Sequence, residues 1–204
     1  IGRRVNDAGY RVLSGVDLDG RVVLEIGPGE IRHAVNWNGR PAHVHLVDID
    51  EDMAARGAEV LRRLDVPHDV QLLGDDHRLP LADGSVDVVV SFYSLEHIWP
   101  LPPTLDEIAR VLAPGGVLVG GIPTEGGLAW GLGRLLTSRR WLRRNTTIDP
   151  DKLICWEHPN LADEVIERLD GAFERRLLRR WPLRWLPSLD ANLLVTFVYR
   201  RRPA

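Results

Sequence analysis

From about residue 21 the chain alternates short β-rich runs with helical patterns, and this alternation constrains its fold more than any other feature. Such an alternation is typical of a mostly parallel sheet with helices on both faces. We therefore expect an α/β, doubly wound, mostly parallel seven-stranded sheet in a single domain over residues 1–204. The predicted strands are 22–26, 43–48, 70–73, 86–92, 117–122, 173–180 and 192–199.

Three helices are predicted between these strands. The first spans residues 50–64, where acidic residues favour its positive N-terminus. Thr104 and Glu107 have the spacing of a capping box and predict the start of the second helix. Asn160 is expected to cap the third helix and Gly171 to stop it. The inner face of the first helix is expected to carry Met53, Gly57, Val60, Leu61 and Leu64.

Residues 123–158 interrupt the alternation and are rich in Gly, Arg and Trp, so we expect a cap inserted over the carboxyl edge of the sheet. Two segments, 130–145 and 179–187, interleave Trp with Arg. One interpretation is a lid that binds an acidic or amphipathic acceptor, or that rests on an anionic membrane surface. The interpretation that we favour is a helical cap with a solvated basic face, or a contact in a homodimer.

Composition excludes several classes of protein. The net charge of −3 argues against a nucleic-acid binder held by bulk electrostatics. No apolar run approaches the roughly 18 residues that a membrane-spanning helix needs, and no secretory signal is expected. The single cysteine, Cys155, excludes an internal disulfide framework and favours a cytoplasmic location.

A glycine turn, EIGPG at residues 25–29, follows the first predicted strand. Ligands of open parallel sheets lie beyond the carboxyl ends of the strands, and glycines there permit positive φ and close approach of the main chain. A tight turn without a ligand is the other interpretation. Arg32 stands where a dinucleotide fingerprint needs Gly or Ala, and Glu30, at the expected start of a helix, would repel a diphosphate. Because Glu25 adds negative charge, the turn suits a cationic ligand without phosphate. This ligand preference argues against a nicotinamide-dependent oxidoreductase.

The run VLEIGPG at residues 23–29 resembles the first motif of the class I S-adenosylmethionine-dependent methyltransferases, and in particular the small-molecule enzymes of methyltransferase type 11. Further motifs follow in the order of that family, and the resemblance covers roughly residues 20–122. They are VDID at 47–50, GDDHRLPL at 74–81, DGSVDVV at 83–89, SFYSLEHI at 91–98 and RVLAPGG at 110–116.

The resemblance implies S-adenosylmethionine as cofactor, a molecule with a sulfonium, an ammonium and one carboxylate but no phosphate. Backbone N–H groups of Gly27 and Gly29 are expected to meet its methionine part, and Asp48 to accept hydrogen bonds from both ribose hydroxyls. Asp75 is expected at the adenine amino group, with the Asp76 N–H at the ring. Alternatively, Asp75 or Asp76 caps a turn and Asp48 caps the following helix. The implied cofactor-binding set is Glu25, Gly27, Gly29, Asp48, Ile49, Asp75, Asp76 and Ser91.

Two histidines are candidate general bases for an acceptor hydroxyl: His97, just after the fourth strand, and His158, at the end of the insertion. For each, a packing or capping role is the alternative, and Tyr93 and Glu96 are interpreted as structural. His43 and His45 share one strand face, but an H-x-H pair has no third ligand beside it, so no metal site is predicted.

The sequence therefore predicts an S-adenosylmethionine-dependent methyltransferase with a small-molecule acceptor, such as a sugar, lipid-linked or secondary-metabolite hydroxyl. The alternative is a catalytically silent methyltransferase-like domain that binds or assembles with a partner. That alternative requires the loss of residues that bind the cofactor, and no glycine or acid of the motifs is missing.

Overall fold

The computed structural model of the protein describes residues 2–74, 77–125, 127, 129–130 and 159–203. These residues contain a seven-stranded sheet in the order β3-β2-β1-β4-β5-β7-β6. Neighbouring strands are parallel except where β7 pairs antiparallel with β5 and β6. The predicted doubly wound, mostly parallel sheet is confirmed.

The strands agree with the predicted ranges to within a few residues, except that β5 begins five residues early, at the end of a helix. The strands are β1 (Val22–Ile26), β2 (His43–Asp48), β3 (His68–Leu72), β4 (Val86–Phe92), β5 (Leu112–Pro123), β6 (Glu174–Trp181) and β7 (Leu194–Arg200). The α-helices are α1 (Gly2–Tyr10), α2 (Glu51–Arg63), α3 (Leu101–Val111) and α7 (Ala162–Ala172), and the short 3-10 helices are η1 (Arg11–Gly15), η2 (Arg32–Asn36) and η3 (Leu95–His97).

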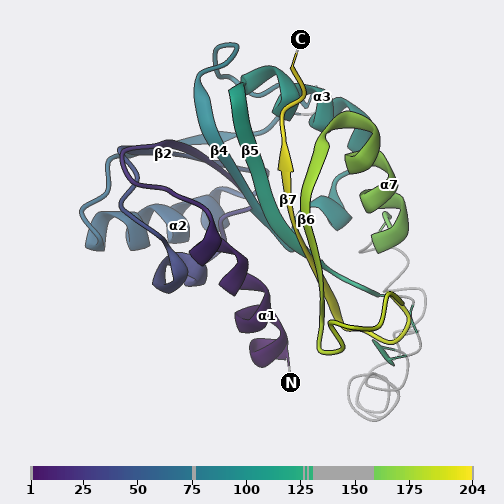
Figure 1. Ribbon diagram of the computed structural model, residues 1–204. Coiled ribbons are helices and arrows are strands. Elements are labelled where there is room, and N and C mark those ends of the chain that lie inside the picture. Colours follow the sequence, from purple (N-terminus) through teal and green to yellow (C-terminus); the bar gives the residue numbers. More distant parts are fainter. Residues whose placement is uncertain (1, 75–76, 126, 128, 131–158, 204) are drawn as a thin grey trace, which may run out of the picture.

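The sheet is the middle layer of the molecule, with α1 and α2 on one face and α3 and α7 on the other (Figure 1). Alternate residues of each central strand enter two separate cores, as the two-residue repeat of a strand requires. In β1, Val23 belongs to the core beneath α2, whereas Leu24 and Ile26 belong to the core beneath α3 and α7.

Helix α2 forms close to its predicted bounds. The Asp50 side chain accepts a hydrogen bond from the Met53 N–H at 3.1 Å, which satisfies one of the free donors at the helix start. Gly57 and Leu61 are buried as expected, but Met53 and Leu64 are exposed, so the predicted inner face was too wide.

The capping box predicted for α3 is wrong. The helix begins at Leu101, and prolines occupy its first turn, where a missing N–H costs no hydrogen bond. Thr104 is consequently inside the helix and fully buried. Glu107 accepts hydrogen bonds from the Leu79 N–H and from Arg110, not from the start of the helix.

The predicted cap of α7 is also wrong. The buried Asn160 amide donates to the carbonyls of Leu95 (3.2 Å) and Ile98 (2.7 Å), so it ties the start of α7 to η3. The helix runs from Ala162 to Ala172, and Gly171 lies in its last turn.

Two segments near the N-terminal end of the chain differ from expectation. Helix α1, which is not among the predicted helices, packs against the sheet, and the Tyr93 hydroxyl donates to the Asn6 carbonyl at 3.1 Å. After the glycine turn the chain forms only the five-residue η2, preceded by Ile31 at φ 45°. Glu30 is therefore exposed ahead of a short 3-10 helix and does not stand at an α-helix N-terminus, as the sequence had indicated.

Most of the predicted cap, residues 131–158, lies outside the described residues. None of the helices in the described ranges combines the length and hydropathy that a membrane crossing requires.

Candidate cofactor site

The order of the strands reverses at the carboxyl ends of β1 and β4. The chain passes from β1 to β2 on one side and returns to β4 on the other, which makes this edge the switch point where open α/β sheets bind ligands. Several residues of the predicted site follow strands that end here. They are Gly27 and Gly29 after β1, Asp48 and Ile49 at the end of β2, Ser91 in β4 and His97 in η3.

The backbone conformation and the neighbouring Ser94 side chain both require a glycine at the first position of the turn. Gly27 has φ 68°, and a Cβ there would clash with the Ser94 side chain, whose hydroxyl donates to the Ile26 carbonyl at 3.1 Å. The N–H of Gly27 donates to the Val47 carbonyl at 2.9 Å. This N–H therefore holds β1 to β2, and its expected contact with the methionine part of a cofactor stays a prediction.

The second glycine leaves free space. Gly29 has φ 49°, and a Cβ built on it would meet no atom within 4 Å. Pro28, between the two glycines, is buried, and a Cβ at Gly57 of α2 would lie 3.0 Å from its Cβ. The turn thus packs against α2 through Pro28, and the space beside Gly29 is open, as the approach of a ligand to the backbone requires.

Asp48 lies beside this turn. The register pairs Ile26 with Val47, so the next residue of β2 stands next to Gly27. The Asp48 side chain accepts a hydrogen bond from the Asp50 N–H at 3.0 Å, while Asp50 itself caps α2. Burial raises the pKa of the Asp48 carboxyl above its ordinary value, and the Asp50 and Ile49 N–H groups partly oppose this rise. The Ile49 side chain is exposed.

Glu25 does not present a free charge beside the turn, and the expectation that it does is wrong. Its side chain is 2% exposed, and Oε1 lies 3.0 Å from His33 Nε2. The Trp37 indole in turn donates to His33 Nδ1 at 3.2 Å. Burial raises the pKa of Glu25, and His33 opposes that rise. His33 is a partner that sequence reasoning missed, because only the fold of η2 brings it back to β1.

Two polar atoms at the carboxyl end of β4 lack partners among the described residues: Ser91 Oγ and Glu96 Oε2. Both side chains are buried. Burial raises the pKa of Glu96 to about 8, and the nearby Glu125 carboxyl adds to the rise. Buried polar groups ordinarily have partners, so unpartnered ones indicate either a ligand or a protonated side chain.

His97 is exposed at the end of η3, the short helix that follows β4. Its N–H donates to the Ser94 carbonyl at 3.0 Å, and Asn160 fixes the adjacent carbonyls. His97 therefore lies on a well-supported turn near the switch point. The other predicted catalytic residue, His158, and the adenine-site residues Asp75 and Asp76 lie outside the described residues.

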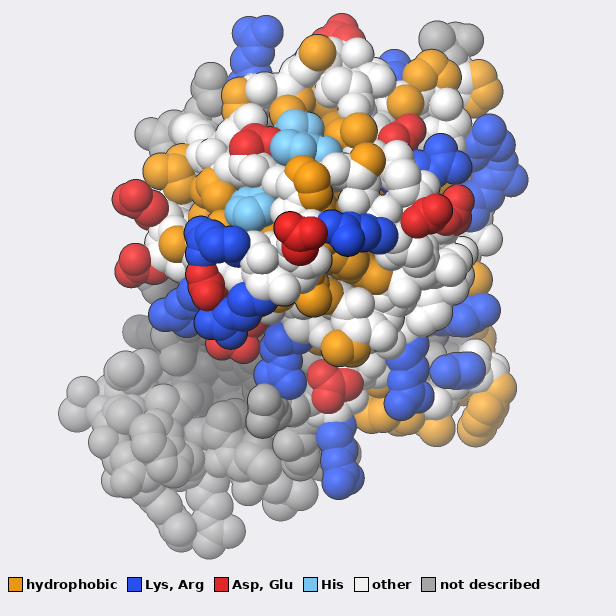
Figure 2. Space-filling view, turned by 90° about the vertical axis from the view of Figure 1, so that its left-hand side faces the viewer, with side chains coloured by type: hydrophobic (Ala, Val, Ile, Leu, Met, Phe, Trp, Pro, Cys, Tyr) orange, Lys and Arg blue, Asp and Glu red, His pale blue; other side chains and the backbone are white. Residues whose placement is uncertain are grey.

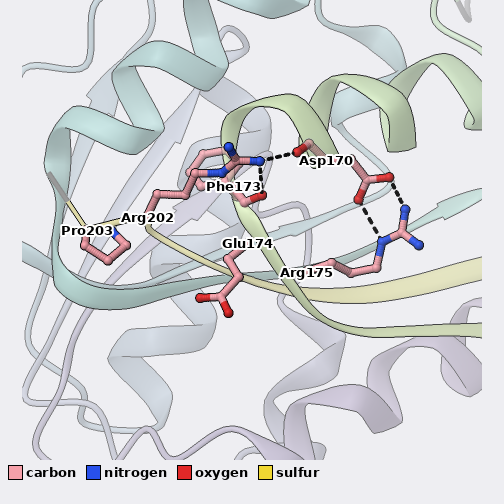
Figure 3. A pocket seen from close by; sticks show the side chains of 6 residues that line it. All are labelled: Asp170, Phe173, Glu174, Arg175, Arg202 and Pro203. Atoms are coloured by element: carbon pink, nitrogen blue, oxygen red, sulfur yellow. Dashed lines mark hydrogen bonds and ion pairs between the residues drawn. The ribbon is translucent and has the colours of Figure 1, made fainter.

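A separate cavity of about 630 Å³ lies at the opposite end of the sheet (Figure 3). Arg202 reaches across it to the carbonyls of Asp170 (2.6 Å) and Phe173 (3.2 Å), and Arg175 pairs with the Asp170 carboxylate. Arg202 thus satisfies carbonyl groups at the C-terminal end of α7, and Arg175 neutralises the Asp170 carboxylate beside them.

The sequence profile of a methyltransferase domain matches residues 24–120 of the chain. A probable S-adenosylmethionine-dependent methyltransferase of Mycolicibacterium smegmatis is 39% identical over 106 residues, which are 52% of this chain and 39% of that protein. A malonyl-[acyl-carrier protein] O-methyltransferase of Yersinia pestis is 32% identical over 123 residues, 60% of this chain and 44% of that protein. The matched segments thus span less than half the length of these relatives.

Solved structures share the fold. A methyltransferase from Aquifex aeolicus superposes with a TM-score of 0.65 at 17% identity, covering 98% of this chain and 93% of that one. The [4+2]-cyclase SpnF gives the same TM-score and identity, covering 98% of this chain and 81% of that one. At such identities the likeness concerns the fold alone. The motifs and the profile over residues 24–120 carry the assignment, and the domain belongs to the class I S-adenosylmethionine-dependent methyltransferases.

Proposed function

We propose that the chain transfers the methyl group of S-adenosylmethionine to an oxygen of a small-molecule acceptor, such as a sugar, lipid-linked or secondary-metabolite hydroxyl. The observation that carries this proposal is the Asp48 carboxylate beside the glycine turn at the switch point. The relatives named as malonyl-[acyl-carrier protein] O-methyltransferases support an oxygen acceptor.

The described residues have separate tasks in this proposal. Asp48 holds both ribose hydroxyls, and the open side of Gly29 leaves room for the methionine part. When bound, the cofactor supplies an electrophilic methyl group on a sulfonium. Because this transfer is an in-line displacement, the main task of the protein is to position the two reactants and exclude water. The five-residue η2 offers no α-helix N-terminus for a diphosphate, which favours a phosphate-free ligand.

Calorimetry with adenosylhomocysteine, the product that remains when S-adenosylmethionine has lost its methyl group, tests the cofactor assignment. We expect saturable binding of one equivalent per chain and no binding of NADH, because the turn lacks an anion site. NADH binding without adenosylhomocysteine binding would contradict the proposal. Methyl-labelled S-adenosylmethionine, incubated with fractionated small molecules and lipids, then separates an enzyme from a silent binding domain: the silent domain binds the cofactor and labels no fraction.

His97 is proposed as the general base that removes the proton of the acceptor hydroxyl. We expect His97→Ala to lower turnover at least tenfold while adenosylhomocysteine affinity changes less than twofold, since removal of a general base typically costs on the order of 100-fold in rate. Turnover and calorimetry on one preparation provide the measurement. His68→Ala, at a half-exposed position on β3, is the control. Turnover equal to that of the unmodified chain would make His97 structural.

A further inference from the structure

We propose that His43, His45 and Asp69 form a binding site for a divalent transition metal ion of the zinc class, on strands β2 and β3. The three side chains each offer one ligand atom, and these atoms all lie within 4.8 Å of one another. In the sequence only the H-x-H pair can be recognised. Asp69 lies 24 residues beyond His45, and strand pairing brings the two together.

The strand register builds the cluster. His43 and His45 are two residues apart in β2, so both point to the face of the sheet opposite α2, while Val44 and Leu46 enter the core beneath that helix. Asp69 pairs with His45 across the parallel ladder and therefore points to the same face. Asp69 Oδ1 lies 2.6 Å from His43 Nε2 and 2.6 Å from His45 Nδ1.

A fourth residue orients the carboxylate. Gln71 Nε2 donates to Asp69 Oδ2 at 2.8 Å, which leaves Oδ1 directed at the two imidazoles. Within the described part of the chain, the buried Gln71 Oε1 has no hydrogen-bond partner. Partners of this kind fix the ligands of metal sites and are nearly as important as the ligands themselves.

The ligand types and the exposure of the cluster suit a cation. The Asp69 carboxylate places an anionic oxygen within hydrogen-bond distance of both imidazoles. The three side chains are 35%, 19% and 37% exposed, which leaves the remaining coordination positions open to water. Figure 2, seen from the side of β2 and α2, shows histidine side chains next to an acidic one at the surface.

Only a small movement separates the present geometry from a coordinated one. Tetrahedral zinc with bonds of about 2.0–2.1 Å places its ligand atoms about 3.3 Å apart. The imidazole nitrogens must therefore withdraw from Asp69 Oδ1 by less than about 1 Å, which rotation of half-exposed side chains on fixed strands allows. Two imidazole nitrogens and one carboxylate oxygen select zinc, cobalt, nickel or copper over magnesium and calcium, which prefer oxygen ligands.

The site is independent of the proposed methyl transfer. His45 precedes Asp48 by three residues, about 10 Å along the strand, and points to the sheet face rather than to the switch point. A bound ion joins β3, the last strand at this edge of the sheet, to β2. We therefore expect it to stabilise this edge.

Zinc titration of the full, tag-free chain after chelator treatment tests the proposal. We expect one zinc ion per chain by calorimetry, a higher Tm with zinc, and d–d absorption bands of tetrahedral or five-coordinate geometry with cobalt. His45→Gln and Asp69→Asn should each weaken zinc binding by about tenfold or more and abolish the Tm shift. His68→Gln is the matched control, because His68 pairs with Val44 in the ladder and so lies on the opposite face.

Circular dichroism of each variant without metal establishes that it is folded. The absence of heat and of a Tm shift at a large excess of zinc overturns the proposal. Equal zinc affinity in His45→Gln and the unmodified chain overturns it as well, because the ion then binds elsewhere. Adenosylhomocysteine binding should be the same with and without zinc, so this result is independent of the proposed function.

Discussion

Asp48→Ala is expected to weaken adenosylhomocysteine binding by about 100-fold. The proposed site gives this carboxylate both ribose hydroxyls, and hydrogen bonds to a charged group contribute about 1.5–3 kcal/mol each. Even the lower value for two bonds amounts to about 3 kcal/mol, or roughly a factor of 100 in the dissociation constant. Asp48 is already half-buried and oriented by the Asp50 N–H, so little further ordering opposes the interaction.

Calorimetry with adenosylhomocysteine measures this effect. Asp52→Ala is the matched control, because Asp52 is an exposed carboxylate in the first turn of the neighbouring α2. Since Asp48→Ala also removes the acceptor of the Asp50 N–H, the Tm of each variant shows whether α2 is intact. An Asp48→Ala chain that is folded and binds as tightly as the unmodified chain contradicts the assignment of the cofactor site.

The sheet could be predicted from local pattern because each strand has its own signal. Val86–Phe92 is apolar at five of its seven positions, as expected of a strand covered on both faces, and it forms β4. The predicted start of α3 was wrong for a local reason. Two prolines directly precede Thr104, and they form the first turn of a helix that begins three residues earlier than the T-x-x-E spacing indicates. Helix α1 was not predicted, because the contacts that hold it, such as that of Tyr93 with Asn6, join residues 87 positions apart.

The candidate site was predictable only where its residues belong to a local motif. The glycines and Asp48 each follow a recognisable strand, and parallel pairing brings their strand ends to one edge. The partners of these residues carry no such signal. Ser94 against Gly27, and His33 against Glu25, are side-chain contacts that the folded backbone creates. The same holds for Asp69, which turns an unremarkable H-x-H pair into a three-ligand cluster.

Glu96→Gln is expected to make the protein less sensitive to rising pH. Burial raises the pKa of Glu96 to about 8, from 4.5 as the ordinary value. Between these two values the folded chain holds a proton that the unfolded chain has lost, so stability falls as pH rises. The slope from a single such group reaches about 1.4 kcal/mol per pH unit. Over the interval from pH 5 to pH 8 the loss amounts to a few kcal/mol, which is large beside a typical total of about 5–15 kcal/mol.

Urea unfolding at pH 5 and pH 8 measures this contribution in Glu96→Gln and in the unmodified chain. Glutamine has the shape of the protonated acid and no charge to bury, so the variant should be similar in stability at pH 5 and more stable by a few kcal/mol at pH 8. Glu167→Gln, an exposed position on α7, is the control and should leave the pH dependence unchanged. Parallel pH dependences of Glu96→Gln and the unmodified chain would show that Glu96 is ionised in the folded state and has a partner there.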